Sequence, residues 1–545
     1  MRPRLRLLAI ATIGVIVAAP AAVSAKSESR ASRQFRAAPR GVVTPAAKGS
    51  VDSVTWAVYR ETNSLDPIVA FDYPENTAIT PLCDALLRQE PDGTIGAGLA
   101  TAITTLNPTT YRIALRKGVK FWDGSPLTAA DVVFSLKRAA DPKAGGFYAA
   151  AFDRVTSITA KGTLAVTIRL SKPDYQLRGE LSSMPGVVVE KRFAKAKGKD
   201  FGTVKAGTMC TGPFKLASWK TGEGVTMVAN PHYWDRTLIA KVKKLIIKGV
   251  PDETAVTSGL LTGELSGNYA LQLSTLDKLR KSSAVHVYEG PSYASDAFIV
   301  SSLKGTLKDV RVRRALSLAI DRQGIVDAVY KGAAAIPHAL ANTGTYGYAP
   351  GVLQAGWDAL PALRTNLDEA KKLVKEAGAQ GKTIRLGTSS ELVALNTEAS
   401  SVKSAADSIG LKAELVSTSA ANYINFFIDA KARAKVDGFF TINYPDYADP
   451  AALYGTLVLA NGSQNYSGYA NPTLTALMEK ARSTADDAKR AALVVEAQKI
   501  ITSELPWIPI VAPTTVLIMS SKITGAPSSF QYMFGPWAAR LGSAG

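Results

Sequence analysis

Two carboxylates and two tyrosines lie close together in one loop of this sequence, within residues 437–450, DGFFTINYPDYADP. The stretch begins with an apolar run that is typical of a buried β-strand, and two prolines stiffen the loop that follows. Ligands of open α/β sheets bind just beyond the carboxyl ends of strands. Because an acid among aromatic faces can hold an ammonium group, we expect Asp446, with Tyr444 and Tyr447 beside it, to bind a cationic ligand.

The same loop has two other interpretations. Asp449 directly precedes Pro450, which is the pattern of a helix cap and explains Asp449 without a ligand. Asp446 and Asp449 could also be a pair of catalytic carboxylates in a hydrolase. A spacing of three residues in a proline-rich loop is weak support for catalysis, so we expect a binding protein and not an enzyme.

Other patterns that would indicate catalysis or metal binding are missing. The three histidines, His232, His286 and His338, are not paired at the spacing of metal ligands, and two lone cysteines add no zinc site. The sequence contains no G-x-S-x-G motif and no P-loop. We therefore expect no metal and no cofactor.

The N-terminus is typical of a secretory signal peptide, which we place at residues 1–25. Three arginines precede an apolar run at residues 7–17, and small residues at 23–25 offer a cleavage site. An uncleaved anchor is the alternative, because residues 7–25 are nearly long enough to span a membrane. No cysteine follows the run, so we expect an exported periplasmic or envelope-associated protein that is not a lipoprotein.

The net charge of the chain is +19, and residues 26–50 contribute part of this excess of positive charge. This basic segment is rich in Ala, Ser and Pro, and we expect it to be a disordered linker. A pI near 9.6 also suggests nucleic-acid binding. An exported protein rarely meets that partner, and we expect no nucleic acid. Cys83 and Cys210 are expected to form one disulfide in the oxidising setting that export implies, with two buried thiols as the alternative.

The chain on both sides of the loop predicts two sets of α/β elements. At 545 residues it is long enough for two or three domains. Strands at 51–60 and 241–250 and a hairpin at 214–228 belong to the first set. A short apolar strand at 297–300 crosses to the second set, and the tail returns to the first.

The second set begins with helices that Asp309, Asp321 and Asn366 cap. Residues 384–416 have the pattern of a βαβ unit, which requires a parallel sheet. The loop with Asp446 follows that unit. This order places the candidate ligand residues at one edge of the second sheet.

Several stretches occur together in the order of a known family. The chain resembles the extracellular solute-binding proteins of family 5, which feed ABC importers for peptides and nickel. The stretches that carry the resemblance are NSLDP (63–67), PLCDALL (81–87), LRKGVKFWDGSPLTAADVVFSLKR (115–138), TGPFKLASW (211–219), NPHYWD (230–235), VRRALSLAIDRQGIV (312–326), LDEAKKLVKEAG (367–378) and LPWIPI (505–510).

The resemblance implies an α/β, two-lobed periplasmic-binding-protein-like fold of type II, from the large cluster with an extra inserted domain. Lobe II would span residues 301–509, and the inserted domain residues 85–203. Lobe I would take residues 51–84, 204–300 and 510–545. The two lobes would close on the ligand.

The resemblance also implies a function: capture of a small solute, most simply a short peptide, and its delivery to the transmembrane permease subunits of an ABC importer by a monomer. In dipeptide-binding members an aspartate in a similar loop anchors the α-amino group of the ligand, and Asp446 matches that place. The family's usual tryptophan-glycine lead is replaced here by Asn443-Tyr444-Pro445. The substrate therefore stays open between a peptide, a nickel chelate, an opine and a saccharide, and a scaffold without ligand is a further alternative.

Four more residues are candidates for the ligand pocket. Asn63 lies in the turn after the first strand, where family members line the cleft, although a turn residue needs no ligand. Tyr73 and Tyr293 either stack on a ligand or pack in the core, and the same holds for Trp357.

Overall fold

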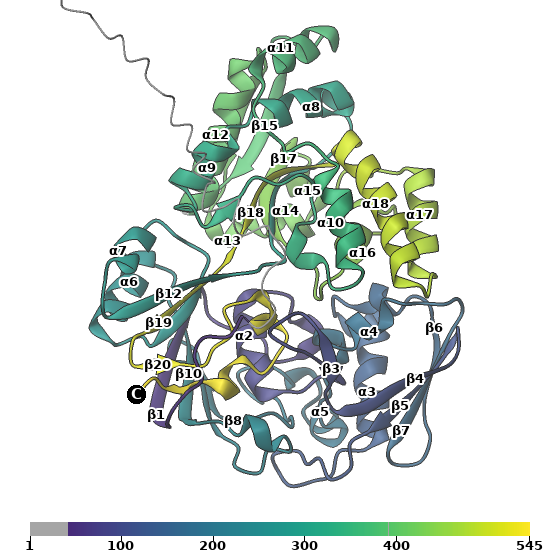
Figure 1. Ribbon diagram of the computed structural model, residues 1–545, viewed down its shortest axis with the longest axis vertical. Coiled ribbons are helices and arrows are strands. Elements are labelled where there is room, and N and C mark those ends of the chain that lie inside the picture. The colour runs from purple at the N-terminus through teal and green to yellow at the C-terminus, as the bar shows by residue number, and fades with distance from the viewer. Residues whose placement is uncertain (1–41, 391) are drawn as a thin grey trace, which may run out of the picture.

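Two β-sheets form the cores of two stacked halves of the molecule (Figure 1). The computed structural model describes residues 42–545 apart from residue 391. We call the half with the seven-stranded sheet lobe I and the half with the six-stranded sheet lobe II. Lobe I is the lower half of Figure 1, and the C-terminus lies there beside β1. The predicted α/β class with two lobes is confirmed.

The sheet of lobe I has the strand order β12-β19-β11-β1-β10-β9-β8. β1 pairs in parallel with both β10 and β11, so the carboxyl ends of these three strands meet at one edge. The predicted hairpin is present as β8 and β9. The elements are β1 (Val51–Val58), α2 (Tyr73–Leu82), β8 (Phe214–Lys220), β9 (Gly224–Ala229), β10 (Val242–Gly249), α6 (Glu253–Thr262), β11 (Gly267–Ala270), α7 (Leu276–Arg280), β12 (Val285–Gly290), β19 (Thr515–Ser520), β20 (Ile523–Thr524) and β21 (Gly542–Ser543).

The sheet of lobe II has the order β14-β18-β13-β17-β15-β16, and the predicted βαβ unit is present as β15, α12 and β16. Asp309, Asp321 and Asn366 cap their helices as predicted. The strands are β13 (Ser295–Val300), β14 (Ala334–Ala335), β15 (Thr383–Thr388), β16 (Lys412–Ser417), β17 (Gly438–Asn443) and β18 (Trp507–Pro513). The helices are α8 (Val310–Ala319), α9 (Arg322–Ala328), α10 (Pro350–Asp358), α11 (Leu367–Glu376), α12 (Val393–Ser408), α13 (Ala420–Tyr423), α14 (Asn425–Ile428), α15 (Ala430–Arg433), α16 (Pro450–Val458), α17 (Pro472–Arg482) and α18 (Asp487–Glu504).

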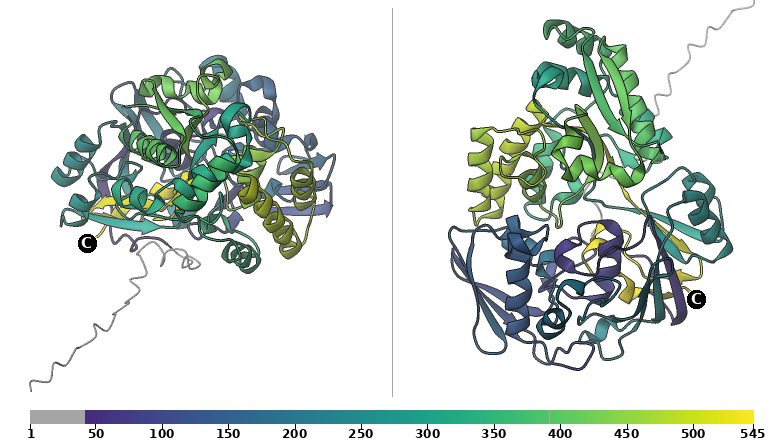
Figure 2. Two further views of the ribbon diagram at one scale, coloured as in Figure 1. Left: turned by 90° about the horizontal axis from the view of Figure 1, so that it is seen from above. Right: turned by 180° about the vertical axis from the view of Figure 1, so that it is seen from behind.

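A separate four-stranded antiparallel sheet, β4-β5-β7-β6, lies at the side of lobe I below α17 (Figures 1 and 2). It packs on α3 around a core of its own, which includes Ile113, Val132 and Ile168. Thr128 and Asp131 form the capping box of α3. We propose this part as the inserted domain. Its elements are β2 (Leu87–Gln89), β3 (Ile95–Ala97), β4 (Ala100–Asn107), β5 (Thr110–Leu115), α3 (Ala129–Ala140), β6 (Val155–Ala160), β7 (Ala165–Leu170), α4 (Leu177–Glu180) and α5 (Lys191–Lys197).

The lobe boundaries predicted at residues 300 and 510 differ from the observed sheets. β13 pairs with β17 and β18 in the sheet of lobe II, so residues 295–300 do not belong to lobe I by strand pairing. β18 continues to Pro513 in the same sheet. The physical reason is that both crossing strands are buried in lobe II along their whole length, and the apolar run at residues 297–300 is only the second part of β13. The chain therefore changes lobes before Ser295 and after Pro513.

Residues 42–50 lie against the C-terminal tail, so the prediction of disorder is wrong for this part of the segment 26–50. The Thr44 amide donates to the Ala526 carbonyl at 3.1 Å, and the Lys48 amide donates to the Ser543 carbonyl at 2.9 Å. The side chains of Thr44 and Ala47 are buried. The rest of the segment and the predicted signal peptide at residues 1–25 lie outside the described residues.

The predicted disulfide between Cys83 and Cys210 is confirmed, with a sequence separation of 127 residues. It joins the end of α2 to the chain just before β8. The elements from β2 to α5 lie between these two points in the chain, so the bond ties the two ends of this part together. Within residues 42–545 apart from 391, no helix has both the length and the apolar character to cross a membrane.

Candidate ligand-binding site

Asp446 lies in the loop that joins β17 to α16, at the edge of lobe II that faces lobe I. Its backbone carbonyl accepts a hydrogen bond of 2.6 Å from Gln89 Nε2 in the inserted domain. Its carboxylate is only partly buried, and within the described residues it makes no hydrogen bond and no ion pair. Burial alone raises the pKa of Asp446 to about 7. The carboxylate is thus left without a protein partner among the described residues.

Asp449 has the structural role that its sequence pattern predicts. Its carboxylate caps α16 by accepting the Ala451 amide hydrogen at 2.8 Å. Gln176 Nε2 and the Tyr348 hydroxyl also donate to it, at 3.3 and 3.2 Å. These contacts use the carboxylate for packing α16 against α4 and explain Asp449 without catalysis.

Tyr444 brings the aromatic residues of both lobes together. Its ring centroid lies 5.2 Å from that of Tyr73 and 4.9 Å from that of Phe530. Its hydroxyl donates to the Phe71 carbonyl of lobe I at 2.9 Å. Tyr444 and Tyr73, both candidates from the sequence, therefore meet at the junction of the lobes.

Tyr293 reaches the same cluster from the crossing between the lobes. It is 1% exposed, and its ring lies 5.3 Å from that of Phe530. Its hydroxyl accepts a 2.7 Å hydrogen bond from Gln531 and donates to Gln89 Oε1 at 3.4 Å. Gln89 also donates to the Asp446 carbonyl, so Tyr293 positions the Asp446 loop indirectly, through Gln89.

Tyr447 is buried and fixes the loop to α4 of the inserted domain. Its hydroxyl donates to Glu180 Oε1 at 2.9 Å. Its ring covers Gly179 so closely that a Cβ at residue 179 would lie 2.2 Å from Tyr447 Cδ2. Glycine is thus required here by close approach and not by its backbone angles. The contact places Glu180 beside Asp446.

Glu180 and Tyr148 are functional candidates that the sequence did not reveal. Burial and the negative charge of Asp446 raise the pKa of Glu180 to about 8, and the hydrogen bond from Tyr447 acts in the opposite direction. Burial and the charges of Asp446 and Glu180 raise the pKa of Tyr148 well above its usual range. Glu180 looks like an ordinary solvated helix acid in the sequence, and Tyr148 like one of many scattered aromatics. Neither stands in a motif that could have identified it.

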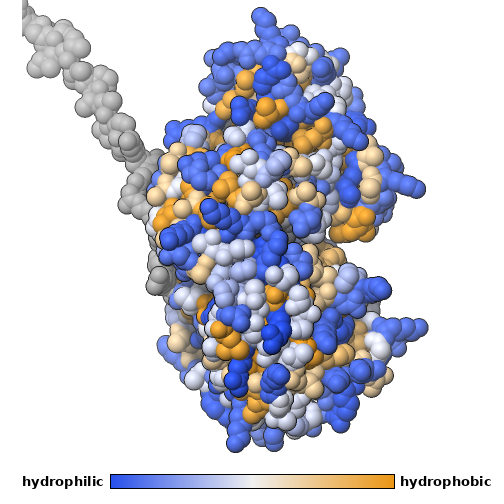
Figure 3. Space-filling view, turned by 90° about the vertical axis from the view of Figure 1, so that its right-hand side faces the viewer, coloured by the Kyte–Doolittle hydropathy of each residue, from blue (hydrophilic) through white to orange (hydrophobic). Residues whose placement is uncertain are grey.

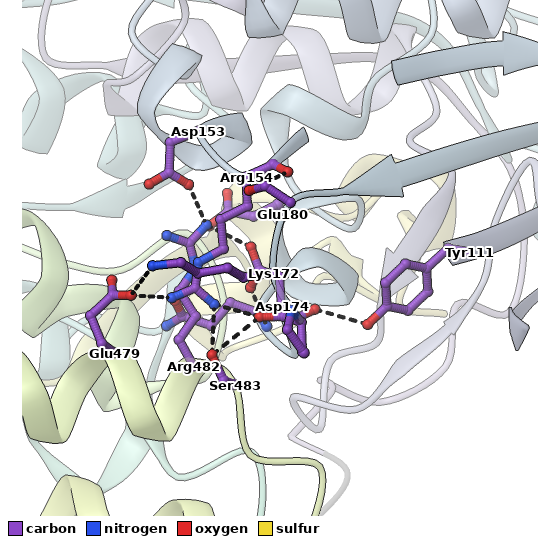
Figure 4. A network of polar contacts seen from close by, with 12 residues as sticks. Tyr111, Asp153, Arg154, Lys172, Asp174, Glu180, Glu479, Arg482 and Ser483 are labelled. Atoms are coloured by element: carbon purple, nitrogen blue, oxygen red, sulfur yellow. Dashed lines mark hydrogen bonds and ion pairs between the residues drawn. The ribbon is translucent and has the colours of Figure 1, made fainter. Parts of the chain in front are cut away.

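Ion pairs hold the inserted domain against α17 of lobe II (Figure 4). Arg482 of α17 contacts Asp174 at 2.5 Å and Asp153 at 2.8 Å. Arg154 of the inserted domain contacts Glu479 of α17 at 2.7 Å. The outer surface on this side of the molecule is mostly hydrophilic, with apolar residues in small groups (Figure 3). The network fixes α4, and with it Glu180, relative to lobe II.

One cavity lies in lobe I and a second lies at the junction of the lobes, and Tyr73, Tyr269 and Tyr532 are among the residues that line both. The larger one, of about 610 Å³ including space open to solvent, lies at the carboxyl ends of β1, β10 and β11. The other, of about 400 Å³, is lined by residues of both lobes, among them Ile442 at the end of β17. Asp446 lines neither cavity. Since Tyr73 lines both and contacts Tyr444, the aromatic cluster connects the Asp446 loop to this space.

The structure places Asn63 and Trp357 in other surroundings. Asn63 is exposed, and its backbone amide donates to Glu75 Oε1 at 2.8 Å. Trp357 is buried in α10 with its ring stacked on His338, at a centroid distance of 4.8 Å. Both stay predictions and do not belong to the cluster around Asp446. In the described part of the chain, no group of three or more His, Cys, Asp or Glu side chains could hold a metal ion.

Comparison with known proteins identifies the family. Residues 94–465 match the model of the bacterial extracellular solute-binding proteins, family 5 Middle. The periplasmic oligopeptide-binding protein OppA of Escherichia coli is 28% identical over 484 residues, which is 83% of this chain and 85% of that protein.

Solved structures share the fold. The periplasmic binding protein DppA from Helicobacter pylori, in complex with the peptide STSA, has a TM-score of 0.79 at 21% identity over 91% of this chain and 99% of that chain. AgaA of A. tumefaciens R10, in complex with agropinic acid, has a TM-score of 0.77 at 18% identity over 90% and 98% of the two chains. The chain belongs to the family 5 bacterial extracellular solute-binding proteins.

Proposed function

We propose that the protein captures a short peptide between its lobes and delivers it to the transmembrane subunits of an ABC importer. The observation that carries this proposal is the Asp446 carboxylate, which lies at the end of β17 without a protein partner in the described residues. An ammonium group is the ligand that such an acid prefers, and a peptide supplies one at its amino end. The peptides bound by relatives such as OppA and DppA support this choice.

In this mechanism Asp446 fixes the amino end, and the rest of the ligand runs from the aromatic cluster toward the two cavities. An extended peptide would be held mostly through its backbone, with its side chains in roomier pockets. A ligand that contacts both lobes binds the closed form better than the open form and shifts the balance toward closure. Tyr444 and Tyr73 would then be covered by the ligand or would stack on it.

A second candidate is a non-peptide solute that carries an amino group or another cation. Asn443, Tyr444 and Pro445 replace the family's usual tryptophan-glycine lead, and AgaA has the same fold with an opine bound. A nickel chelate and a saccharide belong to the same alternative. In all of these the lobes and their closure stay the same, and only the ligand changes.

We also propose export of the chain through a cleaved signal peptide at residues 1–25, without a lipid anchor, and action as a monomer in the periplasm or cell envelope. The support is the arginine-led apolar run and the membership in an extracellular family. Because residues 42–50 pack on the C-terminal tail, the folded part begins before residue 50.

The experiment that tests the proposal is native mass spectrometry of the exported protein, expressed as the full chain and purified gently from the producing cell envelope. Denaturation then releases whatever is bound. We expect a ladder of short peptides. A single non-peptide mass or a nickel complex would replace the peptide by the second candidate. A protein that is empty, and whose melting temperature is raised neither by a broad panel of peptides nor by the non-peptide solutes, would contradict both.

A further inference from the structure

Glu180 and Asp446 stand out among the carboxylates between the inserted domain and lobe II because neither has a cationic partner in the described residues. Asp174 and Asp153 are paired with Arg482, and Glu479 is paired with Arg154. Asp449 is occupied by the amide hydrogens and the hydroxyl described above. Two partly buried acids beside each other without a cation repel one another when both are ionised, and a cationic group would relieve that repulsion.

The position of Glu180 is fixed from several sides. Tyr447 donates to its Oε1 and lies over Gly179, so the end of α4 cannot withdraw from the loop. The Tyr175 amide donates to the Arg482 carbonyl at 2.9 Å, which holds the start of this segment to α17. Within the described residues, Oε2 of Glu180 has no hydrogen-bond partner. One oxygen of this held carboxylate is thus without a partner in the described part of the chain.

We infer that Glu180 is the second carboxylate of the ligand site and that it selects ligands with two cationic groups at one end, such as peptides that begin with lysine or arginine. This inference rests on the proposed function. Asp446 would take the α-amino group, and Glu180 would take the side-chain ammonium or guanidinium of the same residue. Each acid then gains a charge-assisted hydrogen bond, and the repulsion between them is offset.

The raised pKa values of the two acids agree with this arrangement: burial is the main cause for both, and the charge of Asp446 adds to the rise for Glu180. A purely structural Glu180 would serve only as the acceptor for Tyr447. In that case its replacement would affect every ligand equally, because the position of the loop and not the charge of the ligand would be changed. A preference of the protein for the positively charged peptide therefore distinguishes a ligand-binding Glu180 from a purely structural one.

The test compares two tripeptides that differ only in one charge, Lys-Ala-Ala and norleucine-Ala-Ala, by isothermal titration calorimetry on residues 42–545. Ala-Ala-Lys has the same charge at the other end and serves as the positional control. We expect the wild-type protein to bind Lys-Ala-Ala at least about 10-fold more tightly than either peptide, the size of one hydrogen bond to a charged group. Glu180→Gln keeps the shape and the acceptor for Tyr447, and it should bring the ratio of the Lys and norleucine dissociation constants to about one.

Three outcomes would overturn the inference: no preference for lysine in the wild-type protein, a preference that Glu180→Gln retains, or an equal loss of affinity for both peptides in Glu180→Gln. Binding of norleucine-Ala-Ala to the variant, with a melting transition as cooperative as that of the wild-type protein, shows that the variant is folded and competent. If the wild-type protein binds none of the three peptides, the proposed function fails together with the inference. If all three bind equally well, only the inference fails.

Discussion

The Tyr444 hydroxyl of lobe II donates a hydrogen bond to the backbone carbonyl of Phe71 in lobe I, with 2.9 Å between the two oxygens. The ring of Tyr444 also packs against Tyr73 of lobe I. One side chain thus spans the junction beside Asp446, the proposed anchor of the ligand. Separation of the lobes must break this contact, so we expect Tyr444 to take part in closure as well as in ligand binding.

Tyr444→Phe should weaken ligand binding while leaving the fold intact. The variant keeps the ring in its aromatic cluster and loses only the hydrogen bond between the lobes, whose net value is about 0.5–1.5 kcal/mol. The dissociation constant of a bound peptide should therefore rise by about 2- to 10-fold in calorimetry. Tyr288→Phe is the control, because the Tyr288 hydroxyl has no hydrogen-bond partner in the described residues. An unchanged affinity of Tyr444→Phe would show that the contact is irrelevant to closure.

Arg482→Gln should destabilise the protein more than the loss of an exposed cation in the same network. The change leaves the Asp174 carboxylate, whose side chain is 3% exposed, without its cation. We expect the free energy of unfolding to fall by about 2–4 kcal/mol in urea denaturation, as for other broken buried pairs. Lys172→Gln removes a cation that is 68% exposed and 3.9 Å from Glu479, and it should cost less than about 1 kcal/mol. Equal losses in the two variants would contradict a buried network.

Removal of the disulfide should lower stability markedly. The Cys83–Cys210 bond closes a loop with a sequence separation of 127 residues. In the chain-entropy model, a loop of this size stabilises the fold by about 4–5 kcal/mol. The Cys83→Ala/Cys210→Ala variant should therefore unfold at lower urea concentration than the oxidised protein. The two should differ little once the wild-type protein is reduced, and two reactive thiols in the exported, unreduced protein would refute the bond.

Ligand binding should depend on pH through Asp446 and Glu180. Their folded pKa values of about 7 and about 8 lie above the ordinary carboxyl values of 3.8 and 4.5. The protonated acids stabilise the ligand-free fold. This contribution to the free energy of unfolding is complete below the ordinary carboxyl pKa values, and it is lost as the pH rises through the raised pKa values of the folded protein. A cationic ligand prefers the ionised acids. Its affinity should therefore rise from about pH 5 to pH 8, and binding near pH 7 should release protons.

The proton release can be measured by calorimetry in buffers of different ionisation enthalpy. The groups that face the two acids are Tyr148 and Tyr444 at Asp446, and Asp174, Arg482 and Tyr447 at Glu180. Burial also raises the pKa of Asp296 and Glu398 in lobe II, so single stability curves mix several acids. Glu180→Gln isolates the contribution of Glu180, because this variant should lose the part of the ligand-linked proton release that occurs near pH 8. An unchanged release in this variant would assign the protons to other groups.

The sequence alone predicted the features that depend on local chemistry. The proline after Asp449 indicates a helix cap, and the carboxylate does cap α16. The order of short motifs indicated the family, and two cysteines in an exported chain indicated the disulfide. In each case, neighbouring residue types or their order along the chain carry the information.

Features that depend on distant parts of the chain could not be predicted in this way. The short apolar run at residues 297–300 suits either sheet, and the pairing of β13 with β17 and β18 assigns it to lobe II. Residues 42–50 have a linker composition, but the tail provides partners for their backbone. Glu180 comes to lie beside Asp446 through the contact of α4 with Tyr447, between residues 267 positions apart. No local pattern encodes that contact.

The most direct test of the account is the affinity of Asp446→Asn for a tripeptide and for its N-acetylated form. Asp368→Asn, at an exposed acid in the first turn of α11, is the control. We expect the wild-type and control proteins to bind the free tripeptide more tightly than the acetylated one. Asp446→Asn should weaken binding of the free tripeptide by about 10- to 150-fold, which corresponds to the 1.5–3 kcal/mol of a charged hydrogen bond. An unchanged dissociation constant in Asp446→Asn would contradict the role of Asp446 as the anchor of the ligand's amino group.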